Sequence, residues 1–174
     1  MKTTKHIFLA VALCFCSTFS AKAAYNGTPA TPKQISDENY ATYGFTSTNY
    51  TAYKDWYAIS SAEELYGFAA IVNDGTTSAN GVLTADIVVN ENVLKADGTL
   101  NGRPTHSWTP IGTYSKNFNG KFDGQGHTIS GVYFSNTNDD NYPSGGNYVG
   151  LFGYANGASC KTVGVVDSYI EGYK

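Results

Sequence analysis

The second half of the chain contains a glycine-rich repeat, and this repeat constrains the fold more than any other feature. The tract GQGHTISGVYFS (124–135) aligns with YANGASCKTVGVV (154–166). Four aligned pairs lie 31 residues apart: Gly126 and Gly157, Ile129 and Cys160, Val132 and Val163, Phe134 and Val165. Three upstream pairs lie 30 residues apart: Phe118 and Tyr148, Gly120 and Gly150, Phe122 and Phe152. Short strands between glycine turns are typical of β-rich folds.

This repeat predicts an all-β fold, a short β-solenoid over residues 56–174. One repeat cannot bury its apolar side chains alone, so successive repeats should stack. The expected stacked pairs are Ile129 on Cys160, Val132 on Val163, Phe134 on Val165 and Phe122 on Phe152. Residues 136–147 are interpreted as a polar insertion into the first copy. The alternative is an ordinary β-sandwich, because short strands with glycine turns occur in both folds.

One α-helix is predicted at about 61–73. Ser61 and Glu64 have the spacing of a capping box, and Asn73-Asp74-Gly75 is a typical helix end. The apolar stripe is Leu65, Phe68, Ala69 and Val72. We expect this helix to cap the N-terminal end of the solenoid, where an open edge would favour aggregation. Short strands are expected at 56–59, 83–89 and 108–111.

The N-terminus has the three parts of a secretory signal peptide. Lys2 and Lys5 precede an apolar run at 7–15, and small residues follow up to Ala23. The run is too short to span a bilayer, which needs about 20 residues. We therefore predict cleavage after Ala23 and an exported protein, secreted or at the cell surface; a buried N-terminal helix is the alternative. Residues 24–55 then form an extended lead-in rich in Thr, Asn and Tyr.

Charge and cysteine content narrow the classes of partner. Loss of three lysines with residues 1–23 changes the net charge from −3 to −6, so nucleic acid is a poor partner. No later apolar stretch is long enough for a membrane span. Cys160 becomes the one remaining thiol, which excludes an internal disulfide.

The aromatic residues of the lead-in are the candidate ligand-binding residues, because aromatic faces suit the apolar side of a sugar ring. They are Tyr40, Tyr43, Tyr50, Tyr53, Trp56 and Tyr57. The alternative is that they anchor the lead-in along the fold, since Tyr also favours strands.

Catalytic, metal and cofactor sites are not predicted. Cys160 with His127 could form a nucleophile and base, but the repeat places Cys160 in the core, where a free Cys acts as a small hydrophobe. Asp123 lies in a turn, where Asp usually binds its own backbone. Nothing in the sequence pairs the acidic residues with each other or with Arg103, the one arginine.

Several tracts in the right order resemble the GLUG-motif repeat proteins of bacterial, often Bacteroidetes, surfaces. The tracts are TPIG (109–112), FNGKFDGQGHTISGVYF (118–134) and YVGLFGYANGASCKTVGVVDSYI (148–170), preceded by YAISSAEELYGFAAIVN (57–73) and GVLTADIVVN (81–90). The resemblance implies a right-handed, pectate-lyase-like β-helix that is secreted or at the surface. It implies no established chemistry, since such repeats are mainly parts of larger adhesins.

These observations predict an exported, noncatalytic module for surface adhesion or assembly. A carbohydrate-binding module is the first alternative, and a partial polysaccharide lyase is the second. The expected partners are glycans or another surface protein. Self-association through the open C-terminal end of the solenoid is also expected, because related chains continue with more repeats where this one stops at Lys174.

Overall fold

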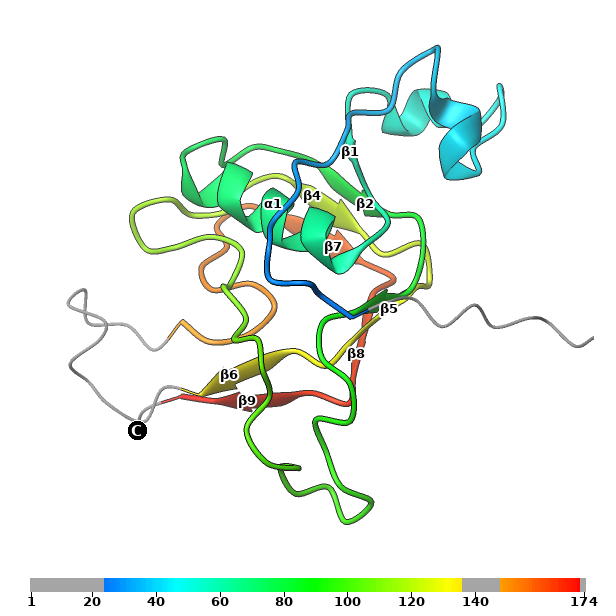
Figure 1. The fold of residues 1–174 in the computed structure, drawn as a ribbon. Helices are drawn as coiled ribbons and strands as arrows, with labels where there is room; N and C mark the ends of the chain where they lie inside the picture. The colour runs from blue at the N-terminus through cyan, green and yellow to red at the C-terminus, as the bar shows by residue number, and fades with distance from the viewer. Residues whose placement is uncertain (1–23, 136–147, 173–174) are drawn as a thin grey trace, which may run out of the picture.

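The computed structural model describes residues 24–135 and 148–172 (Figure 1). Within these ranges the helical elements are the 3₁₀ turns η1 (Tyr40–Tyr43) and η2 (Tyr50–Tyr53) and the α-helix α1 (Ala62–Asn73). The strands are β1 (Tyr57–Ile59), β2 (Gly81–Leu83), β3 (Ile87–Val88), β4 (Lys121–Asp123), β5 (Thr128–Ser130), β6 (Tyr133–Ser135), β7 (Ser159–Lys161), β8 (Gly164–Val166) and β9 (Tyr169–Glu171). The predicted signal peptide and the predicted insertion at 136–147 lie outside the described residues.

All strand pairs are parallel, and they form three small sheets with the orders β1-β2-β4-β7, β3-β5-β8 and β6-β9. Strands β4, β5 and β6, the inner triplet, pair one to one with β7, β8 and β9, the outer triplet. The outer triplet therefore supplies the last strand of every sheet.

The prediction of an all-β solenoid is wrong. The described residues form several short parallel strands in three small sheets together with one α-helix. The strands are only two or three residues long, and a long irregular segment separates β3 from β4. The helix also contributes directly to the core, because Phe68 of α1 contacts the rings of Phe118 and Phe122. It is therefore more than a cap at one end.

The predicted stacking register is also wrong. Ile129 pairs with Val165 and not with Cys160, which pairs with Phe122. Phe134 pairs with Ile170 and not with Val165. One expected contact is present, because the rings of Phe122 and Phe152 lie 5.4 Å apart. The predicted register was wrong because it aligned glycine turns that are not equivalent. A turn after the first strand of the inner triplet was aligned with a turn before the first strand of the outer triplet.

The predicted helix is confirmed as α1. The Ser61 side chain accepts a hydrogen bond from the Glu64 N–H, which caps the first turn. The Glu64 carboxylate in turn accepts from the backbone N–H of Ser60, at 2.7 Å. Leu65, Phe68 and Val72 are fully buried in the main core, as the apolar stripe predicts.

The strand predictions are confirmed in part. The strand at 56–59 is present as β1, whereas the alternating segment at 83–89 divides into the end of β2 and β3. At 108–111 only Ile111 makes an isolated bridge, to Phe152. Among the described residues, no helix has the length and apolar character needed to cross a membrane.

Candidate functional site

The first part of the lead-in runs along α1, where Tyr25 stacks on Tyr66, and its later part packs on the outer face of the four-stranded sheet (Figure 1). Two 3₁₀ turns in this later part replace the extended conformation that was predicted. Ile35 is fully buried against Ala58 and Val82 of β1 and β2. Ala58 faces outward because side chains alternate along a strand. This small apolar cluster is the base on which the aromatic residues rest.

Five of the six predicted ligand-binding residues gather on this cluster: Tyr40, Tyr43, Tyr50, Tyr53 and Trp56. Tyr57 does not join them, because it packs into the main core, with its ring 6.0 Å from that of Phe68. Phe45, which sequence reasoning missed, joins the group. We call these six side chains (Tyr40, Tyr43, Phe45, Tyr50, Tyr53 and Trp56) the aromatic cluster.

The members of the aromatic cluster are held by each other. The rings of Tyr40 and Tyr50 stack at 4.3 Å, which joins η1 to η2. Tyr53 lies between Phe45 and Trp56, with centroid distances of 5.0 and 5.1 Å. The Tyr40 and Tyr50 rings therefore serve packing, whereas Tyr53 and Trp56 lie at the edge of the cluster, next to β4.

A buried carboxylate ties Tyr53 to the sheet. Asp123, at the end of β4, is 2% exposed and accepts a 2.5 Å hydrogen bond from the Tyr53 hydroxyl. It also accepts hydrogen bonds from Thr162 and from the backbone and side chain of Gln125, and it forms a 3.0 Å ion pair with Lys161. The Gln125 amide also donates to the Tyr53 hydroxyl. The lead-in, β4 and β7 thus meet at one side chain.

The environment of Asp123 keeps it ionised. Burial alone would raise its pKa, but hydrogen bonds from Tyr53, Thr162 and other donors outweigh burial and hold the pKa far below its usual range. The turn interaction predicted for Asp123 is confirmed by its bond from the Gln125 N–H. With its charge already paired, this carboxylate is suited to hold the site together and not to act as an acid or base.

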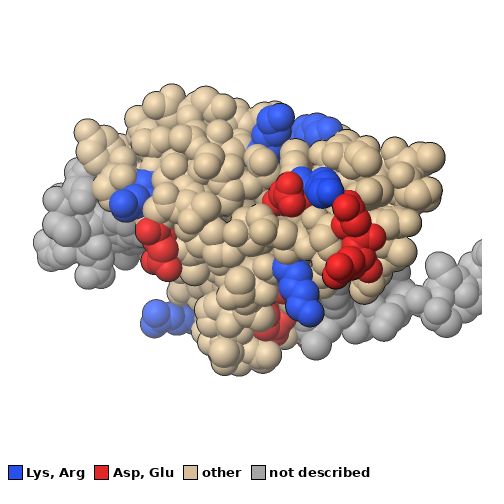
Figure 2. Space-filling model, turned by 90° about the horizontal axis from the view of Figure 1, so that it is seen from above, with Lys and Arg blue, Asp and Glu red and all other residues tan. Residues whose placement is uncertain are grey.

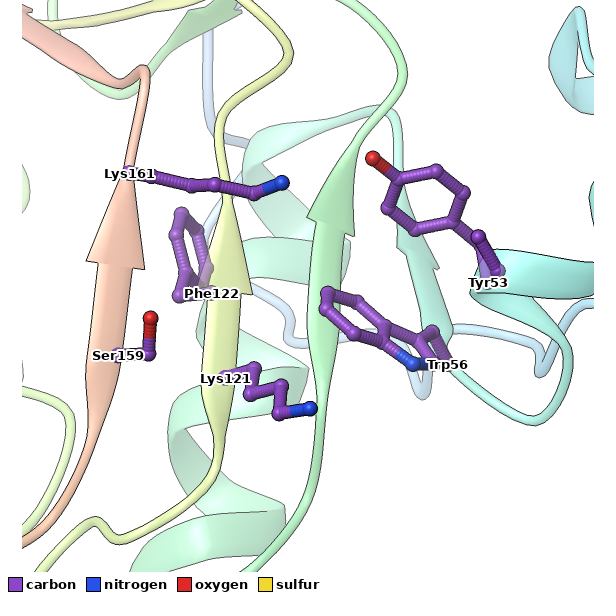
Figure 3. Close-up of a pocket in the computed structure, with 7 residues that line it drawn as sticks. Tyr53, Trp56, Lys121, Phe122, Ser159 and Lys161 are labelled. Carbon is purple, nitrogen blue, oxygen red and sulfur yellow. The ribbon is translucent and has the colours of Figure 1, made fainter. Parts of the chain in front are cut away.

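A groove of about 300 Å³ lies beside this network, on the outer face of β4 and β7 (Figure 3). It is lined by Ala52, Tyr53, Trp56, Lys121, Phe122, Ser159 and Lys161. Figure 3 shows the Lys121 and Lys161 side chains lying across the strands toward the two aromatic rings. Lys161 is paired with Asp123, whereas no carboxylate of the described residues forms an ion pair with Lys121. The groove therefore combines aromatic walls with an excess positive charge.

Two further hollows are present. One of about 270 Å³ lies on the other side of Gln125, between the aromatic cluster and His127. The other, of about 360 Å³, lies near the start of the described chain and includes Arg103 and His106. Figure 2 shows that, on the face seen from above, basic and acidic side chains are scattered in small groups on a mostly uncharged surface.

No hydrogen bond or ion pair within the described residues joins Cys160 to His127, the pair considered as nucleophile and base. Cys160 is exposed on β7, which contradicts its predicted core position. Desolvation by neighbouring atoms and the charge of Asp123 raise the pKa of its thiol, so the reactive thiolate is disfavoured. His127 lies 3.4 Å from Asp86, and its backbone belongs to the turn before β5.

The alternative of a polysaccharide lyase would need carboxylates placed to hold a metal ion, together with a basic residue. In the ranges 24–135 and 148–172, no group of three or more His, Cys, Asp and Glu side chains is placed to hold a metal ion. Arg103 lines the hollow near the start of the described chain, and Asp123 is not among the residues that line it.

The sequence matches no family model, no curated protein and no solved structure. The resemblance to GLUG-motif repeats therefore stays a prediction.

Proposed function

We propose that this chain is an exported, noncatalytic module for adhesion or assembly at a bacterial surface. We propose further that its contact surface is the free edge of the outer triplet. The single observation that carries the proposal is that β7, β8 and β9 are each the last strand of a sheet. Among the described residues no strand pairs with their outer side, and they follow one another within residues 159–171, so their backbone groups form one continuous edge. Such an edge is a template for pairing with another strand.

Apolar side chains accompany these backbone groups. Val165 is 41% exposed, Val166 46% and Ile170 40%. Cys160, on β7, is also exposed. Proteins commonly protect a free edge with lysine, proline or a covering loop. The central residues of β8 and β9 are neither lysine nor proline. Pairing with another chain would remove this surface from water.

The opposite edges of the three sheets are already occupied by the same chain. Gln34 bridges to Tyr57 at the β1 edge. The Tyr25 N–H donates to Val89, just after β3, and the Trp108 N–H donates to Tyr133 of β6. A second copy therefore cannot pair its outer triplet with these edges. It can pair with the other outer triplet, which gives a closed two-fold dimer and not a filament.

Sedimentation velocity of the purified exported chain at rising concentration tests this proposal. We expect a shift from monomer to dimer. Val166→Lys and Ile170→Lys should each keep the chain monomeric, because a charge at the edge opposes pairing. Ala70→Lys, on the exposed face of α1, is the matched control and should dimerise like the parent chain.

Two results would overturn the proposed contact surface. One is a folded monomer at every concentration. The other is a dimer that both edge variants leave intact, which would place the interface elsewhere. Circular dichroism of each variant distinguishes lost pairing from lost folding.

A second candidate function is glycan binding by the aromatic cluster. The observation that favours it is the groove beside Tyr53 and Trp56, whose rings are partly exposed. A glycan-array screen of the exported chain tests it, and binding to no glycan would remove it.

A further inference from the structure

We propose that the groove beside Tyr53 and Trp56 binds a sugar residue that carries a carboxylate, that is, a uronic acid unit of an acidic glycan. This inference rests on the second candidate function, glycan binding, and adds the chemical class of the ligand. Two of the lining residues, Ser159 and Lys161, belong to β7, so the groove borders the free edge of the outer triplet.

The size and walls of the groove set the first condition. Its volume of about 300 Å³ is at the lower end of the range for ligand pockets, which suits one sugar ring of a longer chain. Tyr53 and Trp56 meet at 78°, so they form a corner of two aromatic surfaces. Aromatic rings contact the apolar C–H face of a pyranose favourably, and the Ser159 hydroxyl can donate to or accept from a sugar hydroxyl.

The aromatic wall is held in place before any ligand arrives. The Tyr53 ring packs against Phe45, and its hydroxyl is fixed by Asp123. Trp56 packs against Tyr53 in turn. Because these side chains lose little freedom on binding, the entropic cost of forming the complex is low.

Charge identifies the class of sugar. Of the residues that the structure describes, two lysines and no acidic residue line the groove. The carboxylate that pairs with Tyr53 and Lys161, that of Asp123, is buried and already shared by four donor residues. Lys121 forms no ion pair with any carboxylate in the described part of the chain. An ammonium group beside aromatic walls favours an anionic ligand over a neutral one, and a carboxylate on the sugar ring would lie within reach of Lys121.

Calorimetric titration with two matched trisaccharides tests the inference. One is cellotriose, and the other is the β-1,4-linked trimer of glucuronic acid, which differs only in the carboxylate at C6. We expect the glucuronate trimer to bind about fivefold or more tightly than cellotriose at low salt. This preference should shrink as salt is added, because exposed charge pairs are screened.

Three variants locate the binding site. Lys121→Met should remove most of the preference for the glucuronate trimer, because cellotriose offers no carboxylate to the lost ammonium group. Trp56→Ala should weaken both ligands by about tenfold, because it removes the stacking surface. Lys95→Met, in a loop outside the groove, is the charge-matched control and should change neither.

The outcomes separate the two hypotheses. Equal binding of both trimers, or a preference that survives Lys121→Met, would overturn the assignment of an acidic sugar but would leave glycan binding in place. Binding of neither trimer, together with a blank glycan array, would overturn glycan binding itself and this inference with it.

Discussion

The inner and outer strand triplets have the same order and the same parallel pairing, but they differ in burial. Phe122, Ile129 and Phe134 of the inner triplet are buried. Their register partners Cys160, Val165 and Ile170 in the outer triplet are exposed. The side chains of paired residues in a parallel sheet project to the same side, so their direction does not explain the difference in burial. Burial at these positions depends on whether another strand follows in the sheet.

The turns between the second and third strands of each triplet show the same contrast. Gly131 has φ +78°, and a Cβ atom there would lie 1.9 Å from the carbonyl oxygen of Asn90. At the equivalent turn of the outer triplet, Asp167 has φ +43° and carries a side chain. Its carboxylate accepts from the N–H groups of Val93 and Leu94. The inner turn is enclosed by neighbouring backbone, whereas the outer turn has room for a functional side chain.

The largest expected effect comes from substitution of the enclosed turn. Gly131→Ala combines an unfavourable φ with a direct backbone clash, so it should lower the free energy of unfolding by about 4 kcal/mol or more. Asp167→Ala, at the open turn, should cost about 1 kcal/mol through lost hydrogen bonds. Urea denaturation measures both. Similar losses of unfolding free energy for the two variants would show that the inner turn is no more tightly enclosed than the outer turn.

The next effect compares two paired core positions. Ile129→Ala leaves a cavity in a fully buried site and should cost about 3 kcal/mol. Val165→Ala, at the register partner, should cost about 0.5 kcal/mol, because its side chain is already in contact with water. Denaturation at low protein concentration keeps the comparison to the monomer. A large loss at Val165 under those conditions would show that the outer triplet is covered within one chain.

Asp123 links the two triplets, and its substitution should have an intermediate effect. Asp123→Asn weakens the charged hydrogen bonds from Tyr53 and Thr162 and the ion pair with Lys161. We expect a loss of about 2 kcal/mol at neutral pH.

The pH dependence gives a second measurement for Asp123. Its folded pKa lies below the unfolded value, so its contribution is complete above about pH 4 and is lost as the pH falls further. The difference in stability between the parent chain and Asp123→Asn should therefore narrow below about pH 4. Asp97→Asn, whose carboxylate is exposed, is the control and should change the pH profile much less. A difference that stays constant with pH would mean that the charge of Asp123 is not what stabilises the junction.

Local signals in the sequence predicted α1 well, and they predicted the strand register poorly. Ser61, Glu64 and the apolar stripe all lie within one helix, so no distant contact is needed to recognise them. The register depends on which glycine turns lie side by side. Gly126 was aligned with Gly157, but Gly126 follows β4 whereas Gly157 precedes β7. The turn after the first strand spans 124–127 in the inner triplet and only 162–163 in the outer one, and this difference hid the correct alignment.

The sequence pointed to the aromatic residues of the candidate site but not to its charged residues. The aromatic residues were visible as a group because they lie within 20 residues of each other. Lys121, Asp123 and Lys161 come from two strands and meet the aromatic residues only in the folded chain. Polar residues at alternate positions of β4 and β7 were the available signal, since alternation places them on the outer face. Recognising them required the correct strand limits.

The smallest expected effect concerns Cys160, the register partner of Phe122. Its thiol is exposed, but desolvation and the charge of Asp123 raise its pKa. At neutral pH, labelling by a thiol reagent in the native exported chain should be a few-fold slower than in urea, and the two rates should converge as the pH rises above the thiol pKa. Equal rates at neutral pH would mean that the pKa is not raised. Complete protection in the monomer would mean that β7 is covered, and the contrast between the triplets would then fail at this position.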